Sequence, residues 1–373
     1  MKTVAVWKRA WLPPSETFIR NQIDALQDWR ALPFGVSRLE SILSRESDAI
    51  LFGDSIWDKI ALARFRVTGR SPRVERFLRA NDVSVVHAHF GSEAVSIWRQ
   101  CRHLGIPLVV TLHGHDITAG PKTPGFEGWR YRRRLRRMFA YASAIVAVSE
   151  FIRGQALLYG APASKTVVRY IGIPTRDQRV RDAEPKWDIA FVGRLSEKKG
   201  VSDLLQALVL LGEMGRAARV VIVGSGPLKP ELRAFSKAHR LNVEFLGHQN
   251  SAGVRSVLAA SRFFVAPSQL APSGDAEGFG LVFLEAALAG LAVVAYRHGG
   301  VPEAVADGTT GLLCEEKNVD SLAEAIALFL SDVQRTEHFG TAGSQRVLDH
   351  FDVTSRTAEL EQIYTSVCLP PAD

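Results

Sequence analysis

The chain has little cysteine and no long apolar run, and each shortage excludes a class of protein. Its 373 residues include three cysteines, an odd number without metal-ligand spacing, which argues against a disulfide framework or a zinc site: Cys101, Cys314 and Cys368. No uninterrupted apolar stretch is long enough to span a bilayer, and the apolar run at the N-terminus is too short for a signal peptide. We therefore expect a cytoplasmic protein, large enough for two hydrophobic cores.

Short apolar runs recur along the chain and predict the strands of parallel sheets. Helix-like segments separate many of them, which is the pattern of β-α-β units. The runs lie at 4–7, 83–86, 108–112, 144–148 and 167–171, and again at 189–192, 220–223, 263–266 and 293–295. A polar, charged stretch at 174–185 interrupts this alternation, and we interpret it as a linker between two doubly wound halves. A closing helix is expected at 354–367.

Glu277 and Glu285 flank a glycine-bracketed aromatic turn that opens an apolar segment rich in helix formers, residues 281–289. Gly278 and Gly280 let a ligand approach the backbone closely, and the helix start behind them attracts an anion. On one continuous helix the two acids would lie about 80° apart, eight steps of about 100°, so they need the turn to reach one ligand. A surface charge pair is the alternative, and the glycines and the apolar helix argue against it.

A second polar cluster follows a buried run upstream. Gly193 ends the run 189–192, Arg194 comes next, and Lys199 follows five residues later, before a helical pattern. In open α/β sheets ligands bind beyond the carboxyl ends of the strands. A guanidinium and an ammonium group there would suit the oxygens of a diphosphate, although a solvated basic turn has the same composition.

The run at 220–223 is also followed by glycines, but it lacks the spacing and the acid of a dinucleotide fingerprint. Taken in order, Arg194 and Lys199, then Val-Gly-Ser-Gly-Pro, then Glu277 and Glu285 resemble the retaining glycosyltransferases of family four. The resemblance covers essentially the whole C-terminal half and is specific as a set.

This resemblance implies an α/β protein with the GT-B fold: two doubly wound Rossmann-like domains facing a central cleft, with a C-terminal helix crossing back to the first domain. We place an acceptor-binding domain at 1–180, with the C-terminal helix at 350–370 packing back on it. A nucleotide-sugar donor-binding domain is placed at 181–349.

The resemblance also implies roles for single residues. Arg194 and Lys199 bind the nucleotide diphosphate, Glu277 contacts the donor hexose at the reaction centre, and Glu285 holds the ribose hydroxyls. The nucleobase is expected near Gly224 to Pro227 and the strand end at 245–248. Further backbone contacts are expected from Gly278, Phe279, Gly280 and Leu281. No metal or other cofactor is expected, because enzymes of this family generally need none.

Two histidines lie just past the apolar run 108–112 in the first half. A lone histidine there is more often structural, but His113 matches the position at which the resembling enzymes hydrogen-bond the transferring sugar. For the neighbouring His115 and Asp116, support of the site and contact with the acceptor stay open as alternatives. A metal site is disfavoured.

The loop after the first strand departs from the commoner family pattern, in which a Gly-Gly pair contacts phosphate and acceptor. Here residues 9–18 read Arg-Ala-Trp-Leu-Pro-Pro-Ser-Glu-Thr-Phe, with Ser15 in an N-cap position and Glu16 inside the first helical turn. The Ser-Glu-Thr-Phe-Ile start is similar to bacterial exopolysaccharide transferases of the colanic acid and succinoglycan type. Their acceptors are usually undecaprenyl-diphosphate-linked oligosaccharides.

These implications predict a retaining glycosyltransferase that moves a hexose from a nucleotide-diphosphate sugar, UDP in preference to GDP, to a lipid-linked oligosaccharide or similar glycan. The protein would mainly supply positioning and charge stabilisation. Two alternatives remain: a GT-B sugar-nucleotide 2-epimerase, and a non-catalytic nucleotide-sugar-binding partner in a polysaccharide complex.

Basic residues are concentrated in the first half of the chain. Residues 1–180 contain 28 Lys and Arg against 15 Asp and Glu, whereas the remainder contains 18 against 24. Much of the excess lies in 129–139, where a helical wheel opposes an apolar face to a basic face: Arg132, Arg133, Arg134, Arg136 and Arg137.

Either the arginines are solvated while the apolar face packs on the domain, or they bind anionic lipid headgroups or a pyrophosphate. Nucleic-acid binding is disfavoured, because no recognisable reading module accompanies the patch. If the arginines bind anionic lipid headgroups, the protein would be a peripheral protein at the inner face of the plasma membrane.

Overall fold

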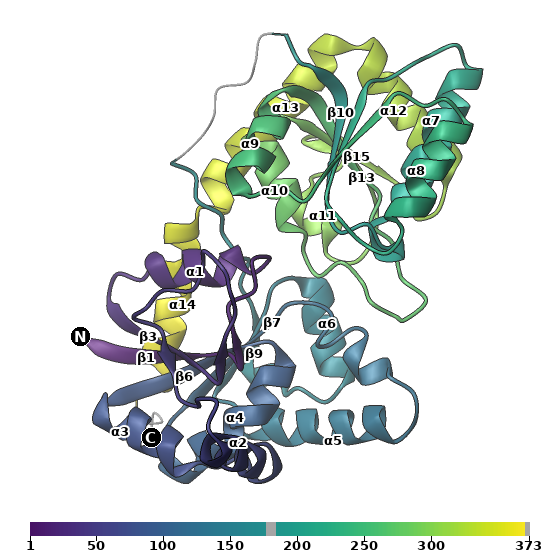
Figure 1. The fold of residues 1–373 in the computed structure, drawn as a ribbon. Helices are drawn as coiled ribbons and strands as arrows, with labels where there is room; N and C mark the ends of the chain where they lie inside the picture. The colour runs from purple at the N-terminus through teal and green to yellow at the C-terminus, as the bar shows by residue number, and fades with distance from the viewer. Residues whose placement is uncertain (177–183, 370–373) are drawn as a thin grey trace. The chain divides into compact units, whose positions relative to one another are not determined.

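The computed structural model describes residues 1–176 and 184–369, and within them the chain forms two compact units (Figure 1). Unit 1 contains residues 1–172 and 353–369, and unit 2 contains residues 173–176 and 184–352. The predicted domain boundary at 180 lies outside the described residues, as does most of the linker predicted at 174–185.

Unit 1 is built on a seven-stranded parallel sheet with the order β5-β3-β1-β6-β7-β8-β9. Because the order reverses between β1 and β6, the topological switch point lies there, and ligands of such sheets bind outside the carboxyl ends of these strands. The strands are β1 (Lys2–Trp7), β3 (Trp29–Gly35), β5 (Ala49–Ile50), β6 (Val83–His89), β7 (Leu108–Leu112), β8 (Ala144–Ala147) and β9 (Thr166–Val168), beside a small pair, β2 (Ala10–Trp11) and β4 (Ser37–Arg38).

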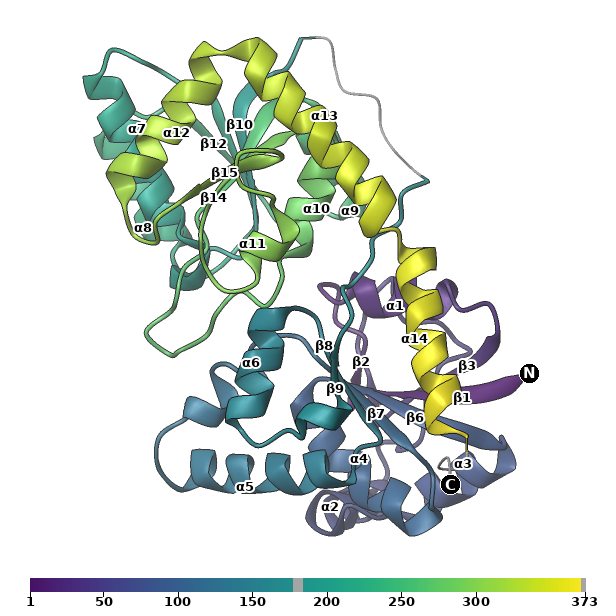
Figure 2. The same cartoon turned by 180° about the vertical axis from the view of Figure 1, so that it is seen from behind.

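Helices connect and cover these strands, as Figure 2 shows from behind. They are α1 (Thr17–Asp24), α2 (Ile56–Thr68), α3 (Pro72–Ala80), α4 (Gly91–Leu104), α5 (Gly125–Tyr141), α6 (Glu150–Leu158) and α14 (Val353–Val367), with the short 3-10 helices η1 (Gly120–Lys122) and η2 (Ala163–Lys165).

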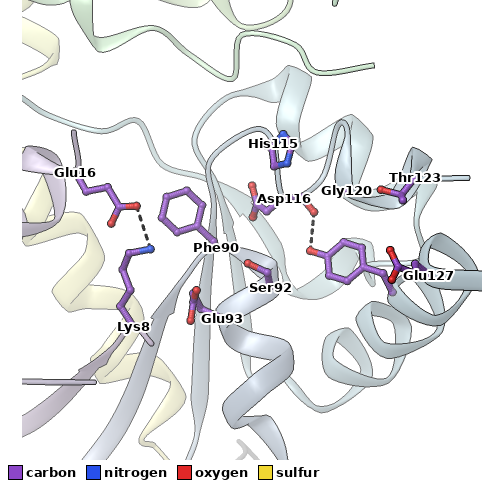
Figure 3. Close-up of a pocket in the computed structure, with 11 residues that line it drawn as sticks. Lys8, Glu16, Phe90, Ser92, Glu93, His115, Asp116, Gly120, Thr123 and Glu127 are labelled. Carbon is purple, nitrogen blue, oxygen red and sulfur yellow. Dashed lines mark hydrogen bonds and ion pairs between the residues drawn. The ribbon is translucent and has the colours of Figure 1, made fainter. Parts of the chain in front are cut away.

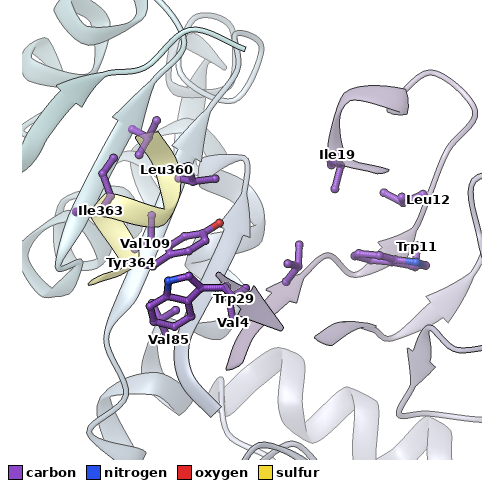
Figure 4. Packing of buried hydrophobic residues seen from close by; sticks show 13 residues of the cluster. Val4, Trp11, Leu12, Ile19, Trp29, Val85, Val109, Leu360, Ile363 and Tyr364 are labelled. Carbon is purple, nitrogen blue, oxygen red and sulfur yellow. The ribbon is translucent and has the colours of Figure 1, made fainter. Parts of the chain in front are cut away.

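The closing helix α14 packs into the core of unit 1, as the fold prediction required. Its residues Leu360, Ile363 and Tyr364 belong to one buried cluster with Val4 and Val85 of the central strands (Figure 4). The hydroxyl group of Tyr364 also lies within hydrogen-bond distance of a buried residue of the sheet, 2.7 Å from Nδ1 of His87.

One local prediction in unit 1 is wrong. Helix α1 begins at Thr17, and Glu16 rather than Ser15 is its N-cap residue, without a side-chain capping bond. The carboxylate of Glu16 is ion-paired with Lys8 at 3.0 Å instead.

Unit 2 repeats the doubly wound plan with a six-stranded parallel sheet in the order β12-β11-β10-β13-β14-β15, so its switch point lies between β10 and β13. Its strands are β10 (Trp187–Val192), β11 (Val220–Val223), β12 (Val243–Gly247), β13 (Ser261–Ala266), β14 (Ala292–Tyr296) and β15 (Gly311–Cys314). Its helices are η3 (Glu197–Lys199), α7 (Val201–Glu213), α8 (Lys229–Ala238), α9 (Ser251–Ala259), α10 (Leu281–Leu288), α11 (Val301–Ala304), α12 (Val319–Ser331) and α13 (Val333–His350).

Each predicted apolar run overlaps one of these strands, although β9 ends at Val168 and the run predicted there extends to 171. The expectation of two parallel doubly wound sheets is confirmed. Among the described residues, no helix combines the length and the hydropathy that crossing a bilayer requires.

Candidate functional site

Two polar clusters predicted in unit 2 meet at the switch point of its sheet. Lys199 ends η3, which follows β10, and Glu277 lies in the loop after the neighbouring strand β13. The ammonium group of Lys199 donates a hydrogen bond to Oε2 of Glu277. The structure therefore brings together two residues that the sequence assigned to one ligand but not to each other.

Lysine charges hold Glu277 in its ionised form. Burial alone would raise the pKa of Glu277, but the ammonium groups of Lys199 and Lys198 lower it to about 2. Lys198 itself forms an ion pair with Asp275 at 3.2 Å and donates to the carbonyl oxygen of Ala276 at 3.3 Å. Because Glu277 is a carboxylate at neutral pH, it can accept hydrogen bonds from sugar hydroxyls and stabilise positive charge.

Sequence reasoning missed a histidine behind Glu277. The backbone N–H of Glu277 donates to Nε2 of His298 at 3.4 Å, and Nδ1 of His298 lies 2.7 Å from Oε2 of Glu316. Since Nε2 accepts this bond, the donor of the ring is Nδ1, which faces the Glu316 carboxylate. These two hydrogen bonds hold the loop that carries Glu277. The sequence signal for them was a histidine after the run 293–295.

The turn between the two predicted acids has the geometry that its glycines suggested. Gly280 is the N-cap of α10 with a φ of +88°, and it supplies no side-chain cap. Gly278 is close to a neighbouring loop, because a Cβ on Gly300 would lie 2.1 Å from the Gly278 carbonyl oxygen. The helix N-terminus therefore starts immediately behind Glu277 and leaves its first N–H groups without a side-chain cap.

Glu285 lies one turn into α10 and is half-buried. Burial raises the pKa of Glu285 to about 7, and Arg255 offsets this only in part. A carboxyl group with this pKa can donate or accept a hydrogen bond near neutral pH.

Arg194 does not join the Lys199 and Glu277 pair. Its side chain is exposed, and its guanidinium forms no hydrogen bond or ion pair with any residue in the described ranges. The segments expected near the nucleobase do lie side by side, because the N–H of Gly224 donates to the carbonyl oxygen of Gly247 at 2.8 Å. Gly224 also packs against Gly193, because a Cβ on Gly224 would lie 1.9 Å from the Gly193 carbonyl oxygen.

Unit 1 has a pocket of about 470 Å³ at its own switch point (Figure 3). Its walls come from the segments after β1, β6 and β7, as the topology of the sheet requires. The lining residues are Lys8, Glu16, Phe90, Ser92, Glu93, His115, Asp116, Gly120, Thr123, Glu127 and Tyr131.

A buried ion pair forms one wall of this pocket. Lys8 and Glu16 pair at 3.0 Å with side-chain exposures of 8% and 14%, and the Lys8 ammonium lies 4.5 Å from the centre of the Phe90 ring. Burial raises the pKa of Glu16, although Lys8 opposes this. Oε2 of Glu16 is buried without a hydrogen-bond partner among the described residues. Such an atom is a ready acceptor for a ligand hydroxyl.

The carboxylate of Asp116 accepts hydrogen bonds from three backbone N–H groups, which favours the supporting role over contact with the acceptor. Its Oδ2 accepts from the N–H of Gly91 at 2.7 Å, and its Oδ1 accepts from the N–H groups of His113 at 3.2 Å and Gly114 at 2.9 Å. Asp116 therefore ties the loop after β7 to the start of α4. His115 is exposed and lines the pocket, which places it where a ligand could touch it.

His113 lies beside this pocket in a cluster of rings. Its Nε2 is 3.1 Å from Nδ1 of His89, and its ring centre lies 4.7 Å from that of Phe18 and 4.5 Å from that of Phe90. Burial lowers the pKa of His113 well below its usual value, so the ring is neutral. Its Nδ1 is buried and has no partner in the described part of the chain. His113 belongs to unit 1 and Glu277 to unit 2.

The basic helix predicted at 129–139 is part of α5. Leu135, Met138 and Phe139 are buried, so the apolar face packs on unit 1, as one of the two alternatives requires. Arg133, Arg136 and Arg137 are exposed, whereas Arg132 and Arg134 are half-buried. Lipid or pyrophosphate binding by this face stays a prediction. Within residues 1–176 and 184–369, no group of three or more His, Cys, Asp or Glu side chains is arranged to hold a metal ion.

Two family models match the chain. The model described as glycosyl transferases group 1 matches residues 173–346, and the model described as glycosyltransferase family 4 matches residues 53–177.

Comparison with known sequences finds several relatives, including the following two. The chain is 30% identical over 250 residues to the putative colanic acid biosynthesis glycosyltransferase WcaL of Escherichia coli, a match that covers 65% of this chain and 60% of that protein. It is 27% identical over 310 residues to a GDP-mannose-dependent alpha-(1-6)-phosphatidylinositol monomannoside mannosyltransferase of Mycolicibacterium smegmatis, with 78% of each chain covered. The chain thus spans about 60% of the length of the first of these relatives.

Among solved structures, HepE of Anabaena in complex with UDP and glucose is similar, with a TM-score of 0.79 and 21% sequence identity. The match covers 98% of this chain and 100% of that one. At this identity the likeness bears on the fold alone, and it confirms the expected GT-B architecture.

Proposed function

Because the chain belongs to the glycosyltransferases of the group 1 and family 4 type, we propose that it is a retaining hexosyltransferase. It would move a sugar from a nucleoside-diphosphate donor to a lipid-linked oligosaccharide or similar glycan acceptor in exopolysaccharide synthesis. The observation that carries the proposal is the Lys199 and Glu277 pair at the switch point of unit 2. The name of the Escherichia coli relative supports the exopolysaccharide context.

The proposed donor site uses the Lys199 ammonium as a bridge. An ammonium group has three N–H donors, so one bond to Glu277 leaves two for oxygens of a diphosphate. As the diphosphate leaves, Lys199 and Arg194 would offset its growing negative charge. The ionised Glu277 would orient the hexose and stabilise positive character at the anomeric carbon. These fixed charges would make a metal ion unnecessary.

The rest of the donor would lie along α10 and the adjoining loops. The uncapped N-terminus of α10 after Gly280 suits a phosphate oxygen. Glu285 would hold the ribose hydroxyls, and the side-by-side loops at Gly224 and Gly247 would face the base. We propose UDP in preference to GDP. The similar Anabaena protein was solved with UDP, while the mycobacterial relative is named for GDP-mannose, so the choice needs a direct test.

The pocket of unit 1 is the proposed acceptor site. Four carboxyl groups line it: Glu16, Glu93, Asp116 and Glu127. Two cations face them, Lys8 in the lining and Arg9, which is ion-paired with Glu93 at 2.9 Å. This balance disfavours a phosphate there, although unit 1 as a whole is basic. Oε2 of Glu16, buried without a partner among the described residues, and the hydroxyls of Ser92 and Thr123 suit the hydroxyls of an acceptor sugar. In this proposal, His113 contacts the transferring sugar as a neutral ring once donor and acceptor are bound.

A panel of UDP, GDP and ADP sugars in a thermal-shift assay tests the donor site. A ligand at one hundred times its Kd stabilises the native state by about 2.7 kcal/mol. We expect UDP sugars to raise the melting temperature most and the Glu285→Ala variant to lose that shift. No shift with any nucleotide sugar would overturn the donor assignment.

Acceptor-dependent release of the nucleoside diphosphate then separates the possible activities. A transferase releases it only when an acceptor glycan is present. A sugar-nucleotide 2-epimerase would convert the nucleotide sugar to its epimer without an acceptor, and a non-catalytic binding partner would neither release the diphosphate nor change the sugar.

A further inference from the structure

Helix α2 is attached to unit 1 by a small part of its surface. Of its thirteen residues, Phe65 alone is buried, and its ring lies 5.9 Å from those of Trp7 and Phe52. Near its first turn, Asp58 is ion-paired with Arg73 of α3. One aromatic anchor and one ion pair therefore hold the helix, and most of its surface faces away from the core of unit 1.

The outward side of α2 carries large apolar side chains. Ile56, Trp57, Ile60 and Val67 are 64%, 73%, 52% and 75% exposed. At about 100° per residue they fall within an arc of about 100°, so they form one stripe along the helix. A helix on the surface of a globular protein normally turns such a stripe toward the core. In α2 the stripe points outward, which marks it as an interaction surface.

Positive charges accompany this stripe. Lys59, Arg64 and Arg66 of α2 are exposed. At about 100° per residue Arg64 falls within the apolar arc, and Lys59 and Arg66 lie about 60–80° beyond its edge at Ile56. The one acidic residue of the helix, Asp58, is neutralised by Arg73. A helix with an apolar stripe that includes tryptophan, and with basic residues beside it, has the composition of helices that lie in the interface of an anionic bilayer.

The basic surface continues from α2 toward α5. A Cβ on Gly69, the C-cap of α2, would lie 3.1 Å from Cδ of Arg99 on α4, so the Arg99 side chain lies against the end of α2. Burial and the positive charges of Arg130 and Arg99 lower the pKa of Arg134 on α5. The three helices are seen together in unit 1 in Figures 1 and 2. An anionic surface would relieve this crowding of like charges.

We propose that α2 is an interfacial membrane anchor. Its apolar stripe enters the boundary between headgroups and acyl chains, while Lys59, Arg64 and Arg66 contact anionic headgroups. A second copy of the chain is the poorer occupant. Two α2 helices packed stripe to stripe would bring six of these cations together, and the only acid of each helix is already paired. The inference stands apart from the donor site and holds whichever sugar is transferred.

Co-sedimentation with phosphatidylcholine vesicles, with and without phosphatidylglycerol, tests the anchor. The double variant Trp57→Ser, Ile60→Ser removes the centre of the stripe, and we expect its partition coefficient on anionic vesicles to fall by at least about tenfold. The matched control is Leu158→Ser, Met214→Ser, which removes two apolar side chains that are 68% and 54% exposed elsewhere. The control should bind as wild type does.

A charge variant and a mapping experiment complete the test. Lys59→Gln, Arg64→Gln, Arg66→Gln should abolish the preference for phosphatidylglycerol, and vesicles should protect residues 56–68 from hydrogen exchange. All substituted side chains are exposed, so the melting temperatures should stay near that of wild type. Wild-type binding by the Trp57→Ser, Ile60→Ser variant overturns the proposal. So does a dimer mass in solution that this variant alone loses.

Discussion

The Lys199 ammonium donates a hydrogen bond to the Glu277 carboxylate, although 78 positions separate the two residues in the chain. Their side chains are only 18% and 10% exposed. Removing one partner of a largely buried ion pair leaves the other charge without compensation, and this costs far more than loss of a surface pair. The pair thus makes one structural unit of the proposed donor site.

Substitution of Lys199 and substitution of Arg194 should therefore differ in their effect on stability but not in their effect on turnover. We expect Lys199→Ala to lower the free energy of unfolding by about 3 kcal/mol, because Glu277 stays buried and ionised. Arg194→Ala should leave it unchanged within about 0.5 kcal/mol, because that side chain is exposed. Both variants should lower turnover by on the order of 10²-fold. Urea unfolding and initial rates measure the two effects.

A matched control comes from the exposed pair of Lys186 and Glu244, at 3.2 Å with side-chain exposures of 62% and 44%. Lys186→Ala should change stability by less than about 1 kcal/mol and leave turnover unaffected. If Lys199→Ala is as stable as this control, the pair is not formed. If Arg194→Ala and Lys199→Ala both retain near-normal rates, the diphosphate binds elsewhere.

Substitutions of Glu277 and Glu285, the two acids on either side of the turn, should have different effects on turnover and on nucleotide binding. Glu285→Ala should weaken nucleotide binding, because a group that holds ribose hydroxyls contributes equally in the ground and transition states. Glu277→Ala should lower kcat more than it weakens binding, because its charge matters most as the anomeric carbon becomes positive. Nucleotide titrations and steady-state rates distinguish them. Equal losses of binding with unchanged turnover in both variants would contradict the assignment.

The pKa of Glu285 gives a prediction about stability and pH. Burial raises it from the ordinary 4.5 to about 7, so the folded chain holds this proton more tightly than the unfolded chain. The stability that the protonated form contributes is complete below pH 4.5 and is lost as the pH rises toward 7. Glu285→Gln removes this loss and should raise the free energy of unfolding by on the order of 1–3 kcal/mol above about pH 7.

Urea unfolding at several pH values checks this, with Glu213→Gln on the exposed end of α7 as the control. The Glu285→Gln gain should fade at acid pH while nucleotide binding stays weaker throughout. A gain that does not depend on pH would mean that Glu285 is not the titrating group.

The sequence predicted the central strands well and the outer strands poorly, for a physical reason. Central strands of a parallel sheet are buried on both faces and read as continuous apolar runs, as in β7 and β11. The missed strand β3 contains Arg30 and Pro33, and proline is rare away from sheet edges. It is tolerated because β5 pairs with β3 only at Phe34 and Gly35.

The same limit applies to the sites. Arg194, Lys199, Glu277 and Glu285 could be named from motif order, but the pairing of Lys199 with Glu277 depends on β10 lying beside β13, which strand order alone decides. The unit 1 pocket was missed because its walls follow three separate strands. Lys8, which pairs with Glu16, gave no local signal beyond its place after an apolar run.

The arginine face of α5 should contact an anionic membrane. Each basic side chain near such a surface contributes about 1 kcal/mol, and added salt reduces this. Replacing Arg133, Arg134 and Arg137 by Gln should therefore strongly reduce binding to anionic liposomes at low salt. Donor binding should not change, because the proposed donor residues lie in unit 2. If the triple variant sediments as well as wild type, the arginines only cover the core with solvated charge.

Substitution of Glu16 should weaken binding of the acceptor and leave binding of the nucleotide donor unchanged. Its Oε2 is buried without a partner at the pocket wall, and a hydrogen bond to a charged group contributes about 1.5–3 kcal/mol. Glu16→Gln keeps the shape but loses the charge, so the KM for the acceptor should rise by about tenfold or more. The Kd for the nucleotide should stay constant, and the exposed Glu46→Gln should behave as wild type.

Because Glu16→Gln also leaves Lys8 without its ion-pair partner, a second variant separates recognition from folding. Thr123→Val removes a hydroxyl from the pocket lining without touching that pair, and it should raise the acceptor KM by a smaller factor at unchanged stability. An acceptor KM at the wild-type value in both variants would show that the acceptor binds outside this pocket. A rise in the nucleotide Kd instead would show that the pocket belongs to the donor.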